Sequence, residues 1–80
     1  MRLDKYLKVS RIIKRRVIAK EAVERGNVLV NGKTAKASTD IKVYDQIEVT
    51  YKGEVGLYKV CLILENATEE KAKEMYERIR

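Results

Sequence analysis

The chain has 80 residues, including 18 Lys or Arg and 12 Asp or Glu, and its formal net charge is +6. This length is enough for one small domain, and the absence of His excludes imidazole catalysis and any zinc site with a histidine ligand. Cys61 is the only cysteine, so no disulfide can form within the chain, which is typical of proteins of the reducing cytoplasm.

The positive charge is concentrated at the start of the chain. Residues 1–16 contain seven Lys or Arg and one acid, whereas residues 17–80 contain eleven charges of each sign. A surface that serves only solubility usually mixes acids with bases. The local excess therefore predicts an anionic partner, with nucleic acid as the first interpretation and an acidic membrane as the second.

The first predicted element is a helix that ends at residues 9–10. Arg2, Lys5 and Lys8 lie on the arc of this helix opposite the apolar residues. Asp4 lies four residues before Lys8, a spacing that permits a weak ion pair. The apolar stripe, with the i, i+3, i+4 spacing of a helix, is Leu3, Tyr6 and Leu7.

A second helix is predicted from Arg15 to Arg25, with Gly26 as its stop signal. Arg16 and Lys20 are four residues apart and stack on its outer face. One continuous helix would scatter the basic residues around its circumference, so the two helices form one basic surface only if they pack together. The residues expected on the inner face are Ile18, Ala19, Ala22 and Val23.

The stretch 27–36 contains the clearest local signal. Asn31 and Gly32 separate the runs VLV and KTA, and this pair is typical of a type I′ hairpin turn because both central residues must accept a positive φ. Residues 45–51 then alternate between polar and apolar side chains, as a strand with one buried face does. Both stretches predict strands of a small, mainly antiparallel sheet.

The end of the chain is predicted to complete this sheet and to cover it. A connection over residues 52–56 leads to a strand over residues 57–64, in which we expect Cys61 to be a small buried side chain. A helix over residues 67–80 is expected to pack on the sheet, with Thr68 as its N-cap. Its apolar stripe is Ala72, Met75, Tyr76 and Ile79.

These elements predict an α+β fold with two N-terminal helices against the sheet and a C-terminal helix on the same domain. Residues 1–64 are expected to form the nucleic-acid-binding domain and residues 65–80 the C-terminal helix. Since Trp and Phe are absent, the core is expected to consist of aliphatic residues, with tyrosines at its margins.

The sequence predicts neither an enzyme nor a metal or cofactor site. No glycine pattern resembles a Walker loop or a dinucleotide-binding fingerprint, and the acids lack the apolar surroundings that would raise a carboxyl pKa for acid catalysis. The longest apolar run, Val60 to Leu64, is far shorter than the roughly 20 residues that span a bilayer. No secretory signal is apparent, so we expect a cytoplasmic protein that does not bind membranes.

Among nucleic acids, folded RNA fits the composition better than DNA. A helix that reads DNA usually carries Asn, Gln or Arg directed at base edges, whereas the second predicted helix offers mainly Arg and Lys. Folded RNA is recognised mostly through its shape, phosphates and 2′-hydroxyl groups, for which such residues suffice. DNA stays an alternative at this point.

The stretch from Arg15 to Lys33, RR-x-x-A-x-x-x-V-x-x-G-x-V-x-VNGK, and the later DIK-x-x-DQIEV motif resemble the RNA-binding domain named after ribosomal protein S4. This resemblance covers about residues 1–52 and implies two antiparallel helices against a short sheet that binds structured RNA. Tyr44 occupies a position where the family commonly has Gly, which puts the conformation of that turn in question.

The opening MRLDKYLKVSRIIKRRVIAKE is similar to stand-alone bacterial members of this family. These are the heat-shock protein fifteen family and, over nearly the whole chain, the RqcP family of ribosome-quality-control cofactors from Gram-positive bacteria. The resemblance implies a factor that binds large ribosomal subunits obstructed by peptidyl-tRNA and contacts both ribosomal RNA and tRNA. It also implies that the factor acts together with an RqcH-type protein, which adds alanine tails to the stalled chain. We expect a monomer.

The resemblance assigns the main RNA contacts to Arg2 and Arg16, and it places Asp4 where an acid orients basic side chains. Three alternatives stay open: a heat-shock-protein-fifteen-like factor that recycles stalled subunits, a general chaperone for structured RNA or DNA, and a membrane-surface protein. The other residues expected to bind RNA are Lys5, Lys8, Arg11, Lys14, Arg15 and Lys20.

Overall fold

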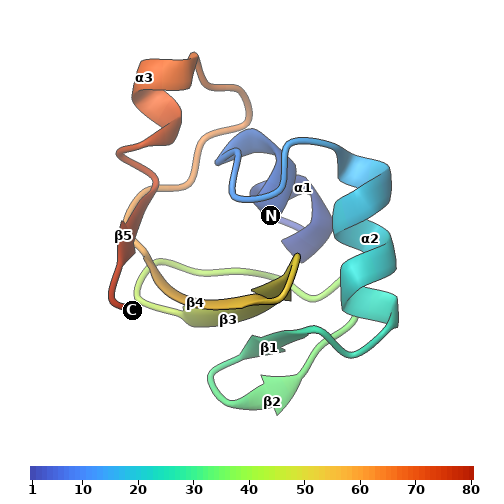
Figure 1. Ribbon diagram of the computed structural model, residues 1–80. Helices are drawn as coiled ribbons and strands as arrows, with labels where there is room; N and C mark the ends of the chain where they lie inside the picture. The colour runs from blue at the N-terminus through green and yellow to red at the C-terminus, as the bar shows by residue number, and fades with distance from the viewer.

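The computed structural model describes all 80 residues. Its helices form a layer on one side of a five-stranded antiparallel sheet (Figure 1). The strands lie in the order β2-β1-β3-β4-β5, so β2 and β5 are the two edges. The elements in chain order are α1 Leu3–Val9, α2 Arg16–Glu24, β1 Val28–Val30, β2 Lys33–Thr34, β3 Gln46–Tyr51, β4 Glu54–Val60, α3 Glu69–Ala72 and β5 Tyr76–Arg78.

The two N-terminal helices agree with the sequence prediction to within about one residue at the predicted boundaries. The apolar stripe of α1 is fully buried, and α2 buries Ala19, Ala22 and Val23 while Ile18 is half-buried. Arg11 adopts a left-handed conformation with a φ of 64°, and its amide donates to the Lys8 carbonyl at 3.1 Å. This reversal ends α1 and separates the two helices.

The core lies between the helices and the sheet and includes residues from both ends of the chain. Tyr6 is fully buried, and its hydroxyl donates a hydrogen bond of 2.7 Å to the carbonyl of Met75, which is also fully buried. Burial raises the pKa of the Tyr6 hydroxyl, which stays neutral. The expectation that tyrosines lie at the margins of the core is therefore wrong for Tyr6, because α1 directs this side chain into the core.

Two tight hairpin turns shape the sheet. Asn31 and Gly32 have φ values of 52° and 80°, which confirms the predicted type I′ turn between β1 and β2. Lys52 and Gly53 repeat the same conformation, with φ values of 52° and 79°, between β3 and β4. The predicted connection over residues 52–56 is thus too long, because this pair alone reverses the chain and β4 begins at Glu54.

The strand predicted over residues 57–64 is displaced along the chain. Strand β4 ends at Val60, so Cys61 follows the strand and is exposed rather than buried. The backbone of Cys61 still donates to the Met75 carbonyl at 2.8 Å, but the thiol is outside the core. The apolar neighbours of Cys61 in the sequence predicted that it is buried, but it is exposed because β4 ends at Val60.

The helix predicted over residues 67–80 is wrong beyond its first turn. Thr68 caps α3 as expected, since its hydroxyl accepts from the Lys71 amide at 3.2 Å, but α3 ends at Ala72. The chain then extends as β5, in which Tyr76 pairs with Val60 across the edge of β4. Of the predicted stripe, Ala72 and Met75 are buried, Tyr76 is half-buried and Ile79 is exposed.

The turn in which Tyr44 replaces the common Gly keeps the conformation that Gly would favour. Tyr44 has a φ of 80°, and this left-handed conformation costs a non-glycine residue about 1 kcal/mol. The carboxylate of Asp45 accepts from the Lys42 amide at 2.9 Å, and the Asp45 amide donates to the Lys42 carbonyl at 3.1 Å. These hydrogen bonds hold the turn against the strain.

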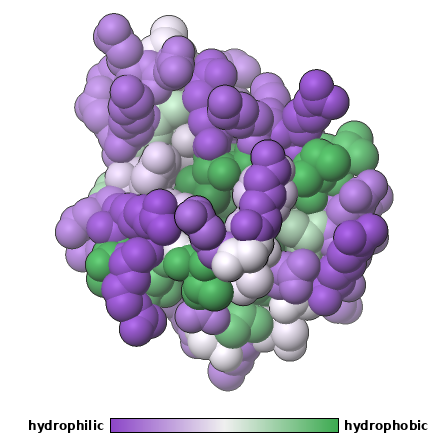
Figure 2. Space-filling view, in the orientation of Figure 1, coloured by the Kyte–Doolittle hydropathy of each residue, from purple (hydrophilic) through white to green (hydrophobic).

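None of the helices is long and apolar enough to cross a membrane. On the face shown in Figure 2, hydrophobic side chains form several small groups among hydrophilic ones instead of one broad apolar patch. The exposed surface is thus dominated by polar and charged groups on that side.

Candidate nucleic-acid interface

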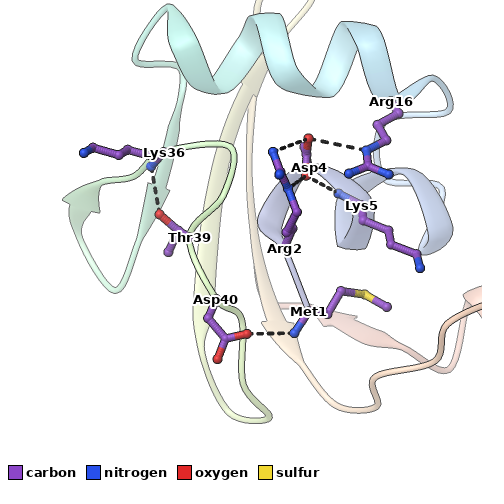
Figure 3. Close-up of polar contacts among 8 residues, drawn as sticks. All are labelled: Met1, Arg2, Asp4, Lys5, Arg16, Lys36, Thr39 and Asp40. Carbon is purple, nitrogen blue, oxygen red and sulfur yellow. Dashed lines mark hydrogen bonds and ion pairs between the residues drawn. The ribbon is translucent and has the colours of Figure 1, made fainter.

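Two arginines, one directly before α1 and one at the start of α2, converge on one buried carboxylate (Figure 3). Arg2 donates from Nε to Oδ1 of Asp4 at 3.1 Å and from Nη2 to Oδ2 at 3.4 Å. Arg16 donates from Nε to Oδ2 of the same carboxylate at 3.4 Å. We call these three residues the Asp4 clamp.

Local structure brings the members of the Asp4 clamp together. Arg2 is the extended residue before α1 and forms an isolated antiparallel bridge with Asp40, so its backbone is held by the segment that connects β2 to β3. Asp4 lies in the first turn of α1, where its carboxylate also accepts from the Lys5 amide at 2.8 Å. Arg16 begins α2, and the packing of α2 on α1 places it beside Asp4.

The Asp4 clamp keeps its carboxylate ionised. Burial raises the pKa of Asp4, but the hydrogen bonds from Arg2, the Lys5 amide and Arg16 outweigh burial and hold this pKa below its usual value of 3.8. The sequence spacing allowed an ion pair between Asp4 and Lys8, and this pair does not form. The carboxylate points toward the two arginines instead, because they satisfy it within the interface between the helices.

Both guanidinium groups stay available to an external ligand. The Asp4 side chain is 3% exposed, whereas the side chains of Arg2 and Arg16 are 51% and 47% exposed. Each arginine has five N–H donors and uses only one or two of them on Asp4. The clamp thus presents two fixed, positively charged forks that match the geometry of phosphate oxygens.

The other predicted residues fall into separate groups. Lys5 directs its side chain away from the clamp and forms an ion pair with Glu65, whose pKa is lowered by this hydrogen bond. Lys8 and Lys20 are exposed on α1 and α2. A groove of about 310 Å³ is lined by Arg11, Lys14 and Arg15 and by neither arginine of the clamp.

The structure adds cationic residues that sequence reasoning missed. Lys36 and Arg2 line a hollow of about 410 Å³ between the end of α2 and residues 35–38. Lys52, in the β3–β4 turn, lines the groove that contains Arg15. Both lysines belong to the charge-balanced part of the chain, so only the tertiary fold shows that they extend the basic surface.

No group of three or more His, Cys, Asp or Glu residues lies close enough together to hold a metal ion. The carboxylate at the centre of the clamp is already occupied by two arginines and one amide. The surface thus offers fixed cationic donors around a buried acid that orients them, an arrangement suited to anions.

Comparison with known proteins gives a consistent result. The family model described as S4 domain matches residues 1–47. The RQC P-site tRNA stabilizing factor of Streptococcus pneumoniae is 53% identical over 79 residues, which cover 99% of this chain and 90% of that protein. The Bacillus subtilis protein of the same name is 43% identical over 76 residues, covering 95% of this chain and 88% of that protein.

The fold is also similar to a solved structure. Heat Shock Protein 15 of Vibrio cholerae, in a structure described as trimeric, superposes with a TM-score of 0.91 and 29% sequence identity. The match covers 98% of this chain and 80% of that chain. The arrangement of two helices on an antiparallel sheet is thus shared with a protein of known structure.

Proposed function

The chain belongs to the S4-domain family and, within it, to the family of RQC P-site tRNA stabilizing factors, and we propose that it binds RNA on obstructed large ribosomal subunits. Its ligands there are the P-site peptidyl-tRNA and adjacent ribosomal RNA. It acts without catalysis, by holding the tRNA in place, and it works in the cytoplasm. The observation that carries the proposal is the Asp4 clamp, which fixes two phosphate-binding arginines on a chain so similar to those factors.

The clamp supports a stabilizing role because its arginines are oriented before RNA arrives. A free arginine loses side-chain freedom when it binds a phosphate, and that loss weakens binding. In the clamp, Asp4 has already restricted Arg2 and Arg16, so less freedom remains to be lost. Asp4 is in this proposal a positioning residue and does not touch the RNA.

A pull-down from bacterial lysate tests the proposal. The tagged protein is expected to co-purify with large subunits that carry peptidyl-tRNA, and Arg16→Ala is expected to reduce their recovery while the melting temperature stays nearly unchanged. The matched control is Arg80→Ala, which removes the same charge from the exposed C-terminus, far along the chain from the clamp. Full recovery with Arg16→Ala would refute the assignment.

The salt dependence of subunit binding provides a second readout. Each phosphate contact that a variant loses is expected to flatten the plot of log affinity against log salt by about 0.7–0.9. Arg16→Ala should show this change and Arg80→Ala should not. A weaker but equally salt-dependent interaction would indicate that Arg16 acts through the fold rather than on a phosphate.

We further propose that the protein supports C-terminal alanine tailing beside an RqcH-type factor. The specific alternative is a recycling factor like heat shock protein 15, which the TM-score of 0.91 favours at the level of the fold. Cells that lack this protein separate the two, because loss of alanine tails on stalled chains supports the first function and intact tails support the second. A protein that bound short RNA duplexes as tightly as ribosomal particles would instead be a general RNA-binding protein.

We also propose that the chain acts as a monomer. On the face shown in Figure 2 the apolar side chains form only small groups, so no broad apolar patch on that side calls for a second copy. Sedimentation of the purified protein tests this directly, and a trimer like that described for Heat Shock Protein 15 would contradict it.

A further inference from the structure

Three neighbouring hollows that share lining residues lie beside the α1–α2 loop. The groove of about 310 Å³ shares Arg11 and Lys14 with a smaller hollow of about 110 Å³ near the end of α1. It shares Ile18, Tyr51 and Lys52 with a hollow of about 240 Å³ on the other side, along α2. We call these three hollows together the loop channel, and no member of the Asp4 clamp lines them.

The loop channel is strongly cationic. Six of its lining residues are Lys or Arg, and the only acid among them is Glu21. None of the six makes an ion pair within 4.0 Å, in contrast to the arginines of the clamp. The cationic residues are Lys8, Arg11, Lys14, Arg15, Arg25 and Lys52.

The middle of the channel combines these cations with an aromatic ring and aliphatic side chains. Tyr51 is half-buried at the end of β3, and Ile12 and Ile18 lie beside it in the lining. The ammonium group of Lys52 lies over the Tyr51 ring, 5.4 Å from its centroid, so a base stacks on that face only after this flexible side chain moves aside. This arrangement places a π-surface within reach of a base and positive charges within reach of its phosphates.

We propose that the loop channel binds a short single-stranded RNA segment, such as an unpaired loop or end, with one base against Tyr51. This inference rests on the proposed RNA-binding function and assigns a second RNA contact to it, separate from the Asp4 clamp. Proteins that bind single strands combine a cationic groove along the backbone with aromatic side chains on which bases stack, and the channel has both.

A single strand fits this surface better than a duplex or an acidic protein. A duplex keeps its bases stacked inside and offers mainly phosphates and sugar edges, so Tyr51 and the two isoleucines would have no partner. The central groove, at about 310 Å³, has the size of a pocket for one small group instead of a helical surface. An acidic peptide would use the cations but would leave the aromatic ring unused.

The test measures the affinity of the purified full chain for two probes by fluorescence anisotropy. The probes are a short labelled oligouridylate and a labelled RNA duplex of the same length. Tyr51→Ala is expected to weaken binding of the single strand by about 5- to 150-fold, the range of one lost base stack, with little effect on the duplex. Tyr51→Phe retains the ring and is expected to bind like the wild type.

Two further variants keep the test valid if Tyr51→Ala is unstable, since Tyr51 packs against the core. Tyr51→Leu removes the ring but keeps an apolar side chain and is expected to lose the same affinity. Arg15→Ala, at an exposed position, is expected to reduce the salt slope of single-strand binding by about 0.7, whereas Lys73→Ala, exposed outside the channel, leaves it unchanged.

Several results would overturn the inference. The inference fails if folded Tyr51→Ala and Tyr51→Leu keep the wild-type affinity for the single strand, or if they lose affinity equally for both RNA probes. It also fails if these variants lose affinity for polyglutamate or for phosphatidylserine vesicles but not for RNA. Failure of the channel is distinguishable from failure of the proposed function. Arg16→Ala reports on large-subunit recovery, while the change in oligouridylate affinity caused by Tyr51→Leu reports on the channel.

Discussion

The Asp4 clamp and the loop channel use the same residue types in opposite ways. In the clamp, two half-exposed arginines share one buried carboxylate, so the net charge of the group is small and its geometry is fixed. In the channel, six cations line three adjoining hollows without any ion pair, so the charge is large and the side chains are free to adjust. Both groups lie in or next to the N-terminal helices.

The two proposed sites would bind anions in different ways. A pre-oriented fork selects a phosphate at one position, because most of its side-chain freedom is lost before binding. A set of free cations attracts any nearby strand and depends strongly on salt. The sequence cannot distinguish these two kinds of site, because Arg16 of the clamp and Arg15 of the channel are adjacent residues of the same type.

The largest expected effect is on the centre of the clamp. Asp4→Asn removes the charge that holds Arg2 and Arg16 and leaves an amide in a buried position. Because hydrogen bonds to charged groups contribute about 1.5–3 kcal/mol, we expect the free energy of unfolding to fall by about 2 kcal/mol. Urea unfolding measures this loss, and subunit recovery should fall with it as the arginines lose their orientation.

The matched control for this variant is Asp40→Asn. Asp40 pairs with the N-terminal ammonium group at 2.7 Å, but its side chain is exposed, so solvent screens the interaction. We expect a clearly smaller change in stability than for Asp4→Asn. Equal losses for both variants would show that burial of the Asp4 carboxylate has no special role.

The second prediction concerns pH and the same carboxylate. The pKa of Asp4 is lower in the folded chain than its usual value of 3.8, so its ionised form stabilises the fold at every pH above that value. This stabilisation is lost as the pH falls below 3.8 and through the folded pKa. The difference in unfolding free energy between the wild type and Asp4→Asn should therefore be constant near neutral pH and shrink in acid.

Variants of the channel provide the contrast for this pH dependence. Arg15→Ala removes a cation that has no carboxylate partner. Its stability relative to the wild type should consequently change little over the same acid range. A pH-dependent difference as large as that of Asp4→Asn would mean that Arg15 is coupled to an acid after all.

The smallest expected effect has the opposite sign. Arg11 lies in the channel and has a φ of 64°, a conformation that a glycine adopts without steric cost. Arg11→Gly is expected to raise the free energy of unfolding by about 0.5–1 kcal/mol while weakening single-strand binding. Removal of the clamp carboxylate costs stability, whereas removal of this channel residue increases it.

Arg11→Ala separates backbone strain from charge in this experiment. Alanine removes the same charge but keeps a Cβ atom in the left-handed conformation. Thermal unfolding should therefore place Arg11→Gly above Arg11→Ala, with both variants equally weak for RNA. If the two variants melt at the same temperature, strain at this position does not limit stability.

The first two-thirds of the fold follow from local signals in the sequence. The stripe of α1, Gly26 after α2, and the Asn31-Gly32 turn each act over a few residues, and the structure confirms all three. Each pattern can be recognised within a short stretch of sequence, because a helical stripe or a turn pair spans only a few residues. What buries the α1 stripe is nevertheless distant along the chain, since its core includes Val60 and Met75.

The C-terminal third does not follow from such signals. Ala72, Met75 and Tyr76 have helical spacing, yet the chain extends after α3 because the free edge of β4 pairs with Tyr76 and its neighbours. Spacing over so short a stretch cannot distinguish a helix from a strand, and the partner strand is about 16 residues away along the chain. The exposure of Cys61 follows from the same pairing.

The sequence alone determined that this chain is a basic α+β domain of the S4 family and that its first 16 residues carry the excess charge. Only the tertiary structure decided how those charges are divided. Packing of α2 on α1 brings Arg16 to the buried carboxylate of Asp4, and the β3–β4 turn brings Tyr51 and Lys52 to the α1–α2 loop. Charge is a property of composition, but the partner of each charge depends on which segments fold side by side.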